Sequence, residues 1–126
     1  LLSIFTFSSC MKDESSCIAK KSNGGINVKV YPVYNGEPVV SRKAFRDTAY
    51  VKYGATSYPG ASLSKYEIKL IGTEGDNFVN ITKLNCGVYY FYLVCQDSAS
   101  GMRLTGGASF ITDKVVGDFD IVIPVS

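Results

Sequence analysis

A repeated alternation of apolar and polar residues is the feature that most constrains how this chain folds. The alternation is clearest in residues 88–96, where Tyr89, Phe91, Leu93 and Cys95 fall on one face. A period of two residues is typical of strands that bury one face. No segment carries a long stripe of apolar residues at helical spacing. The pattern therefore predicts an all-β fold.

The predicted strands are short and regularly spaced. About seven or eight strands at roughly 8–12-residue spacing are typical of two packed sheets, so we predict a single antiparallel β-sandwich. Pro32 cannot donate to a strand ladder, which favours an edge strand or a bulge there, and Gly106-Gly107 is expected to form a bulge. The strands are predicted in residues 26–31, 49–53, 65–70, 79–84, 88–96, 102–105, 109–112 and 118–125.

The beginning of the chain differs from the rest. Residues 1–7 (LLSIFTF) are almost wholly apolar and precede Ser8, Ser9 and Cys10. Such a run is typical of a secretion signal, and it is shorter than the roughly 20 apolar residues that span a bilayer. We interpret residues 1–9 as the remnant of a signal peptide. Residues 10–25 are expected to be a flexible tether, and residues 26–126 the folded domain.

The sequence Phe7-Ser8-Ser9-Cys10 resembles the lipobox of bacterial lipoproteins, although Leu is commoner than Phe at the first position. The resemblance implies that the Cys10 thiol is acylated, because small residues fit a signal peptidase and a thiolate is the nucleophile. Each buried CH₂ adds about 0.8 kcal/mol to anchoring, so several acyl chains hold a protein firmly on a membrane. The alternative is an ordinary cysteine beside an apolar segment.

Lys12-Asp13-Glu14 follows this cysteine and is similar to the short export signal of Bacteroidetes-type surface lipoproteins. That resemblance implies a bacterial outer-membrane protein that is anchored by lipid and exposed to the medium. The same three residues also fit a solvated tether, since charged residues beside serine are common in linkers.

Residues 79–89 (VNITKLNCGVY) are similar to the signature of carboxypeptidase-regulatory-like domains, which have the transthyretin-like, or prealbumin-like, fold. Residues 36–39 (GEPV) resemble a turn of the same family. The resemblance implies that Gly87 permits a tight approach into the following strand and that Leu84 and Tyr89 pack the core. Asn85-Cys86, where the family commonly has two prolines, departs from the pattern, as does the long stretch from residue 39 to residue 49.

The composition excludes several kinds of chemistry. The chain has no His, which removes Ser-His-Asp hydrolysis, Cys-His chemistry and histidine-bound zinc or iron. A net charge of +2 gives no strong field for nucleic acid. The acid pairs Asp118/Asp120 and Glu74/Asp76 fit solvent-facing positions better than a catalytic dyad. We expect a protein that is not an enzyme and has no catalytic residue, metal or cofactor.

The four cysteines limit the disulfides that can form. With Cys10 lipidated, an odd number remains in a compartment that permits disulfides. Cys86 and Cys95 lie about 30 Å apart along one extended segment, at roughly 3.3 Å per residue, and therefore cannot pair. Cys17 can pair with Cys86 if the tether folds back. The interpretation we favour leaves Cys17 and Cys86 free and buries Cys95.

Tyrosines give the main hint of a binding surface. Tyr90 and Tyr92 alternate with the predicted core residues, so we expect them on an outer sheet face, and Tyr31 is a further candidate. Exposed tyrosines are common contact residues at interfaces and in sugar sites. The alternative is that residues 39–46 cover this face.

Two short motifs suggest modification. Asp47-Thr48-Ala49 and Asp97-Ser98-Ala99 resemble the O-glycosylation motif of Bacteroidetes exported proteins. The resemblance implies that Thr48 and Ser98 are candidate glycosylation sites.

These observations favour a cell-surface lipoprotein that acts as a non-catalytic binding or accessory module. We expect it to be held on the membrane through Cys10 and to contact a protein or glycan at the outer membrane, and not nucleic acid. The alternative is a proteinase inhibitor or an envelope-assembly subunit. Such a protein would use a loop or an exposed edge strand, for example residues 26–34, to add to the sheet of a partner.

Overall fold

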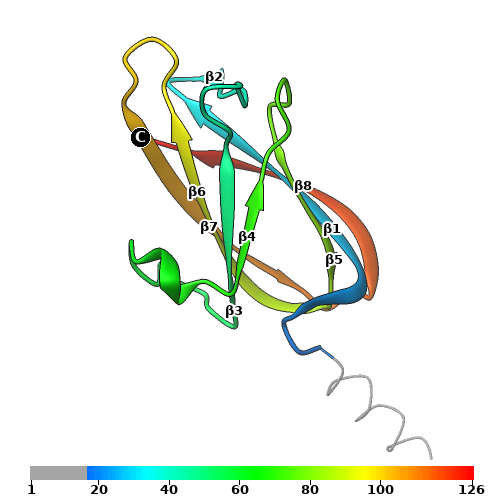
Figure 1. The fold of residues 1–126 in the computed structure, drawn as a ribbon. Coiled ribbons are helices and arrows are strands. Elements are labelled where there is room, and N and C mark those ends of the chain that lie inside the picture. The colour runs from blue at the N-terminus through cyan, green and yellow to red at the C-terminus, as the bar shows by residue number, and fades with distance from the viewer. Residues whose placement is uncertain (1–16) are drawn as a thin grey trace, which may run out of the picture.

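The computed structural model describes residues 17–126, which fold into two packed β-sheets (Figure 1). The predictions for Cys10, Lys12, Asp13 and Glu14 lie outside the described residues. Within the described part of the chain there is no α-helix, which confirms the predicted all-β class. The elements are β1 (Lys21–Tyr34), β2 (Glu37–Pro38), β3 (Thr48–Tyr53), the short 3₁₀ helix η1 (Leu63–Lys65), β4 (Ile68–Ile71), β5 (Val79–Leu84), β6 (Gly87–Gln96), β7 (Arg103–Thr112) and β8 (Val116–Pro124).

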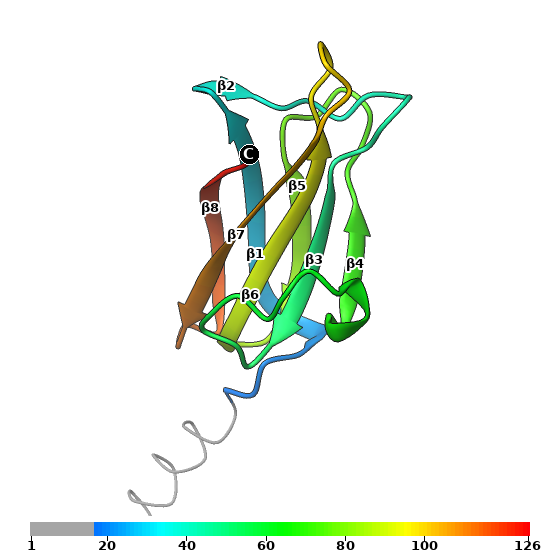
Figure 2. The same ribbon diagram turned by 90° about the vertical axis from the view of Figure 1, so that its left-hand side faces the viewer.

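The two sheets form the predicted sandwich, and Figure 2 shows it with the sheet that contains β3 and β6 toward the viewer. One sheet has the order β4-β3-β6-β7, and all of its neighbours are antiparallel. In the other sheet β1 pairs with β2 and β5 as antiparallel neighbours and with β8 as a parallel neighbour. The first and last strands of the sandwich therefore lie side by side.

Strand β1 is internal, so the predicted edge position of residues 26–34 is wrong. It pairs with β8 from Gly25 to Val33 and with β5 up to Val30, and it meets β2 from Val33 onward. Pro32 lies between the end of the β5 pairing and the start of the β2 pairing. Its missing N–H therefore interrupts neither antiparallel ladder, and this is how a proline fits an internal strand.

Strand β7 is continuous where the sequence predicted two strands and a bulge. The register with β6 runs without a shift from Gly87↔Thr112 to Gln96↔Arg103. Gly107 instead provides space, because a Cβ there would lie 2.5 Å from the Oη atom of Tyr90. The glycine thus lets the Tyr90 ring lie across the neighbouring strand.

The core fills the space between the sheets, and the predicted inward face of residues 88–96 is confirmed. Tyr89, Phe91, Leu93 and Cys95 are all fully buried. The core continues toward β8 through the ring of Phe110, which lies 5.7 Å from that of Phe91. At the end of β8, two backbone hydrogen bonds of 3.0 Å join Ser126 to Thr105 and link the two sheets.

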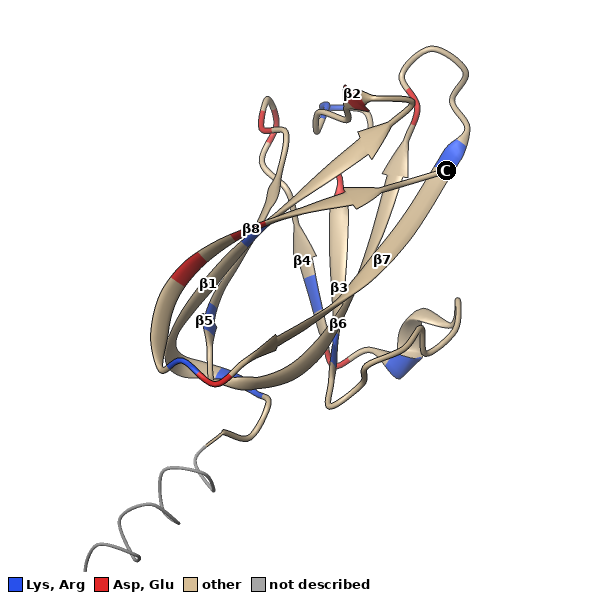
Figure 3. Cartoon of the chain, turned by 180° about the vertical axis from the view of Figure 1, so that it is seen from behind, with Lys and Arg blue, Asp and Glu red and all other residues tan. Residues whose placement is uncertain are grey.

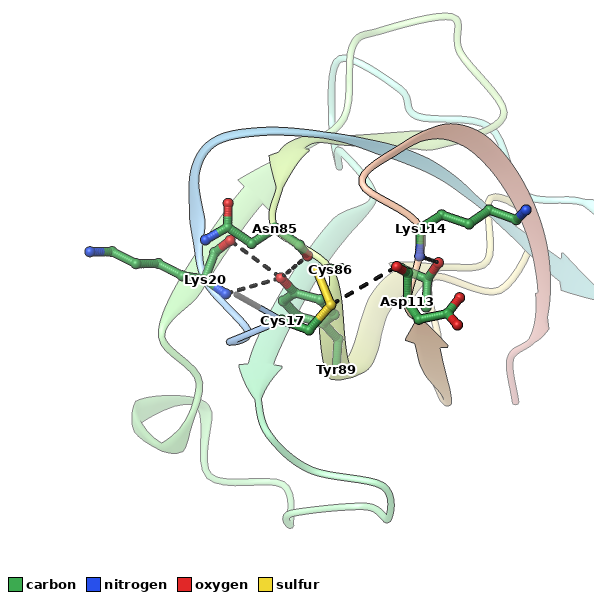
Figure 4. The surroundings of a disulfide bond; sticks show 8 residues. Cys17, Lys20, Asn85, Cys86, Tyr89, Asp113 and Lys114 are labelled. Carbon is green, nitrogen blue, oxygen red and sulfur yellow. Dashed lines mark hydrogen bonds between the residues drawn. A yellow bond between two sulfur atoms is a disulfide. The ribbon is translucent and has the colours of Figure 1, made fainter. Parts of the chain in front are cut away.

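The structured body begins earlier than the sequence predicted. Cys17 and Cys86 form a disulfide, with their Cα atoms 4.7 Å apart (Figure 4). The prediction that both cysteines are free is therefore wrong, whereas Cys95 is buried and not disulfide-bonded, as expected. Strand β1 starts at Lys21, so residues 17–25 belong to the folded body. The tether prediction extended too far because the Ser, Lys and Gly composition of this segment does not reveal the disulfide.

Candidate contact surface

A cluster of tyrosines lies on the outer face of the sheet β4-β3-β6-β7. Tyr90 and Tyr92 project from β6 on the side opposite the core. The connection between β3 and β4, residues 54–67, crosses the front of β6 and β3 (Figure 2). It brings Tyr58 and Tyr66 over the two β6 tyrosines. The tyrosine cluster, as we call it, consists of Tyr50, Tyr58, Tyr66, Tyr90 and Tyr92.

The rings of the cluster pack against one another in a defined geometry. Tyr66 stacks on Tyr92 with centroids 5.6 Å apart and an interplanar angle of 15°. Tyr58 lies 5.5 Å from Tyr92 and 6.2 Å from Tyr90. The Tyr66 hydroxyl donates a hydrogen bond of 2.8 Å to the carbonyl oxygen of Gly60. This bond fixes the connection over the sheet and keeps Tyr58 in place.

Burial divides the cluster into a base and an exposed ring. Tyr92 and Tyr66 are only 4% and 8% exposed, whereas Tyr58 is 51% exposed. Tyr90 and Tyr50 are half-buried at its sides, and Phe45 packs against the same cluster. Residues 54–67 and Phe45 therefore share the covering role that the sequence assigned to residues 39–46 alone. Tyr58 is the ring that a partner can reach.

The hydroxyls of Tyr58, Tyr66 and Tyr90 stay uncharged at neutral pH, because the pKa of each is raised. Burial, followed by the neighbouring tyrosines, raises the pKa of Tyr66 to about 12. Partial desolvation, followed by Tyr92, raises the pKa of Tyr58, while the Arg103 guanidinium opposes this shift. Neutral phenols both donate and accept hydrogen bonds. The surface can thus combine ring stacking with neutral polar contacts, as interfaces and sugar sites commonly do.

Tyr31 lies on the opposite side of the sandwich from Tyr90 and Tyr92. It projects outward from β1, where its hydroxyl lies 3.4 Å from Oδ1 of Asp120 and its ring lies 5.6 Å from that of Phe78. The three tyrosines singled out from the sequence are therefore not one site. The structure brings together two of them and separates the third.

The two glycosylation candidates differ in their surroundings. Thr48 is half-buried at the start of β3, where it pairs with Ile71 of β4 and Val94 of β6. Ser98 is exposed in the turn between β6 and β7. Ser98 is therefore the more accessible of the two candidates, whereas the Thr48 hydroxyl donates a hydrogen bond of 3.2 Å to the carbonyl oxygen of Arg46.

Sequence reasoning missed Tyr58 and Tyr66 as members of the tyrosine cluster. Tyr58 stands in the segment GATSYPG, whose glycines and proline predicted only an interruption between strands. Tyr66 was included in a predicted strand, but it follows η1 directly, and β4 starts at Ile68. A large aromatic residue inside a Gly/Pro-rich connection was the available signal, because such a side chain usually packs against something.

No group of three or more His, Cys, Asp and Glu residues within 17–126 is placed to hold a metal ion. The exposed Asp118 accepts a hydrogen bond of 3.0 Å from the Asn27 amide, consistent with a solvent-facing strand residue. None of the described helices is long and apolar enough to cross a membrane.

Comparison with known proteins finds no matching protein family, no matching curated protein and no matching solved structure.

Proposed function

We propose that this protein is a cell-surface lipoprotein and acts as a non-catalytic binding module, which contacts a protein or glycan through the tyrosine cluster. The observation that carries the contact surface is Tyr58, a half-exposed ring held against Tyr90 and Tyr92. Aromatic rings fixed by packing lose little conformational freedom on binding, which makes them efficient contact residues.

The contact surface is tested by replacing its exposed ring. We expect Tyr58→Ala to reduce binding about tenfold or more, as truncation of a central aromatic contact commonly does. The matched control is Tyr31→Ala, which removes a tyrosine from the opposite side of the sandwich. The assay is affinity capture from intact cells with the anchored protein as bait, together with retention of cell-surface polysaccharide by the purified protein. Equal binding by wild type and both variants would refute the contact surface.

The lipid anchor on Cys10 is proposed from the lipobox-like sequence. If the anchor exists, Cys10→Ala abolishes incorporation of radiolabelled palmitate and releases the protein from the membrane fraction. Replacing Lys12, Asp13 and Glu14 by Ala should keep the label but protect the protein from protease added to intact cells, because the proposed export signal is lost. An unlabelled wild-type protein that still carries its apolar leader would contradict the anchor.

A further inference from the structure

The disulfide determines which end of the sandwich lies near the proposed anchor. It joins Cys17 to Cys86 at the end of the body where Lys21 pairs with Leu84. Asn85 N donates a hydrogen bond of 2.9 Å to the carbonyl oxygen of Lys20, and Lys20 N donates one of 3.0 Å to the Tyr89 hydroxyl. Residues 17–21 are thus attached to the body by covalent and hydrogen bonds (Figure 4).

The distance between Cys10 and this end is short. Seven residue steps separate Cys10 from Cys17, which span at most about 25 Å at roughly 3.6 Å per residue. Strand β6 alone has 10 residues and rises about 33 Å at roughly 3.3 Å per residue. A lipid on Cys10 would therefore hold the disulfide end close to the bilayer, while the far end of an upright body projects away from it.

Unpartnered apolar side chains surround the disulfide. Ile18 is 68% exposed, Val115 is 70% exposed and Val116 is 73% exposed. The two valines line one hollow together with Cys86, and Cys17 Sγ lies 4.0 Å from the carbonyl oxygen of Asp113. Exposed apolar side chains at one tip provide apolar area that can be buried in the interfacial region of a membrane.

The charges at this end complement an anionic bilayer. Lys20, Lys83 and Lys114 are exposed, and Lys20 and Lys114 extend outward on either side of the disulfide (Figure 4). Two acidic residues lie near these lysines. Asp113 precedes Lys114, and Asp118 accepts a hydrogen bond from Asn27, whose Oδ1 atom accepts one from the backbone N–H of Lys83. At the opposite end, acidic turns alternate with basic residues (Figure 3); these acids are Glu37, Glu74, Asp76 and Asp97. A lysine near an anionic surface contributes about 1 kcal/mol of attraction.

We propose that the disulfide end docks on the lipid bilayer, with Ile18, Val115 and Val116 in the headgroup region and Lys20, Lys83 and Lys114 on anionic lipid groups. The proposal rests on the Cys10 anchor of the proposed function. It deepens that function by giving the bound protein an orientation, with its long axis upright on the membrane.

The chain has no Trp, so one introduced Trp reports its own depth. Val116→Trp tests the disulfide end, and Val122→Trp is the matched control, because both residues are exposed on β8. The full chain is coupled through the Cys10 thiol to maleimide lipids in vesicles of phosphatidylcholine and phosphatidylglycerol that contain brominated lipid. We expect Val116→Trp to lose most of its fluorescence and to shift to the blue, while Val122→Trp does neither.

Two further variants separate docking from simple proximity. In the Val116→Trp background, replacing Lys20, Lys83 and Lys114 by Glu should restore most of the fluorescence, as should vesicles of phosphatidylcholine alone. A Gly-Ser insertion between Cys10 and Cys17 should leave the quenching nearly unchanged, because a docked body is held by its own contacts with the bilayer, whereas simple proximity would be lost with a longer tether. Equal quenching at both Trp positions would show a body lying on its side, and no quenching at Val116→Trp would show no docking. Either result overturns the proposal.

The coupling supplies the anchor chemically, so these results do not depend on whether cells acylate Cys10. A negative palmitate experiment would refute the proposed anchor and leave the vesicle result standing. A negative vesicle experiment would refute the docked orientation and leave the anchor and the tyrosine cluster untouched.

Discussion

Asp47 is a buried acid next to the core. It is 1% exposed, and its Oδ2 atom has no hydrogen-bond partner among the residues described. Burial raises the pKa of Asp47 from 3.8 to about 6, although hydrogen bonds from Cys95 and Ser41 and the charge of Arg42 oppose the shift. The carboxyl is thus easier to protonate in the folded than in the unfolded chain.

This raised pKa predicts how stability depends on pH. The folded state binds the Asp47 proton more tightly than the unfolded state does. The stability that protonated Asp47 gives the folded state is therefore complete below about pH 4 and is lost as pH rises through about 6. At about 1.4 kcal/mol per pKa unit, the loss is on the order of 3 kcal/mol. Asp47→Asn should remove this decline, whereas Asp113→Asn, at an exposed position, should retain it. Urea unfolding between about pH 4 and pH 8 measures both; a decline that persists in Asp47→Asn would contradict the prediction.

At the scale of the element, the disulfide fixes the start of β1. It closes a sequence separation of 69 residues, for which the loss of chain entropy in the unfolded state corresponds to about 4 kcal/mol. A double variant with Cys17→Ser and Cys86→Ser should therefore lose about 4 kcal/mol of its free energy of unfolding. It should unfold at a lower urea concentration than the wild type. Reductant should destabilise the wild type and leave the double variant unchanged. Identical unfolding curves for the two proteins would show that the bond adds nothing to stability.

Strands were predictable where the signal is local. The face of Tyr89, Phe91, Leu93 and Cys95 followed from alternation alone, because burial of one face of a strand imposes that pattern. Pairing partners were not predictable in the same way. Pro32 suggested an edge strand, yet β1 is internal. A proline disrupts a sheet only where a neighbouring strand would accept a hydrogen bond from its N–H, and the sequence does not show where the neighbouring strands stop.

At the scale of the whole molecule, the sandwich was predictable and the covering of its outer face was not. The number and spacing of strands define two sheets, whereas the packing of Tyr58 on Tyr90 and Tyr92 depends on where a Gly/Pro-rich connection folds back. The Cys17–Cys86 bond escaped prediction for a related reason. It requires a segment of linker-like composition to return to the body, and composition carries no information about that return.

The parallel pairing of β1 with β8 has a consequence for biosynthesis. Strand β1, the central strand of one sheet, can pair with β2 and β5 earlier, but it lacks its parallel neighbour until residues 116–124 have left the ribosome. Contacts between such distant parts of a chain form late and slowly. A nascent chain that completes its sheet only after residues 116–124 have been synthesised stays unfolded for longer, which is the state that a narrow translocation channel in a membrane accepts.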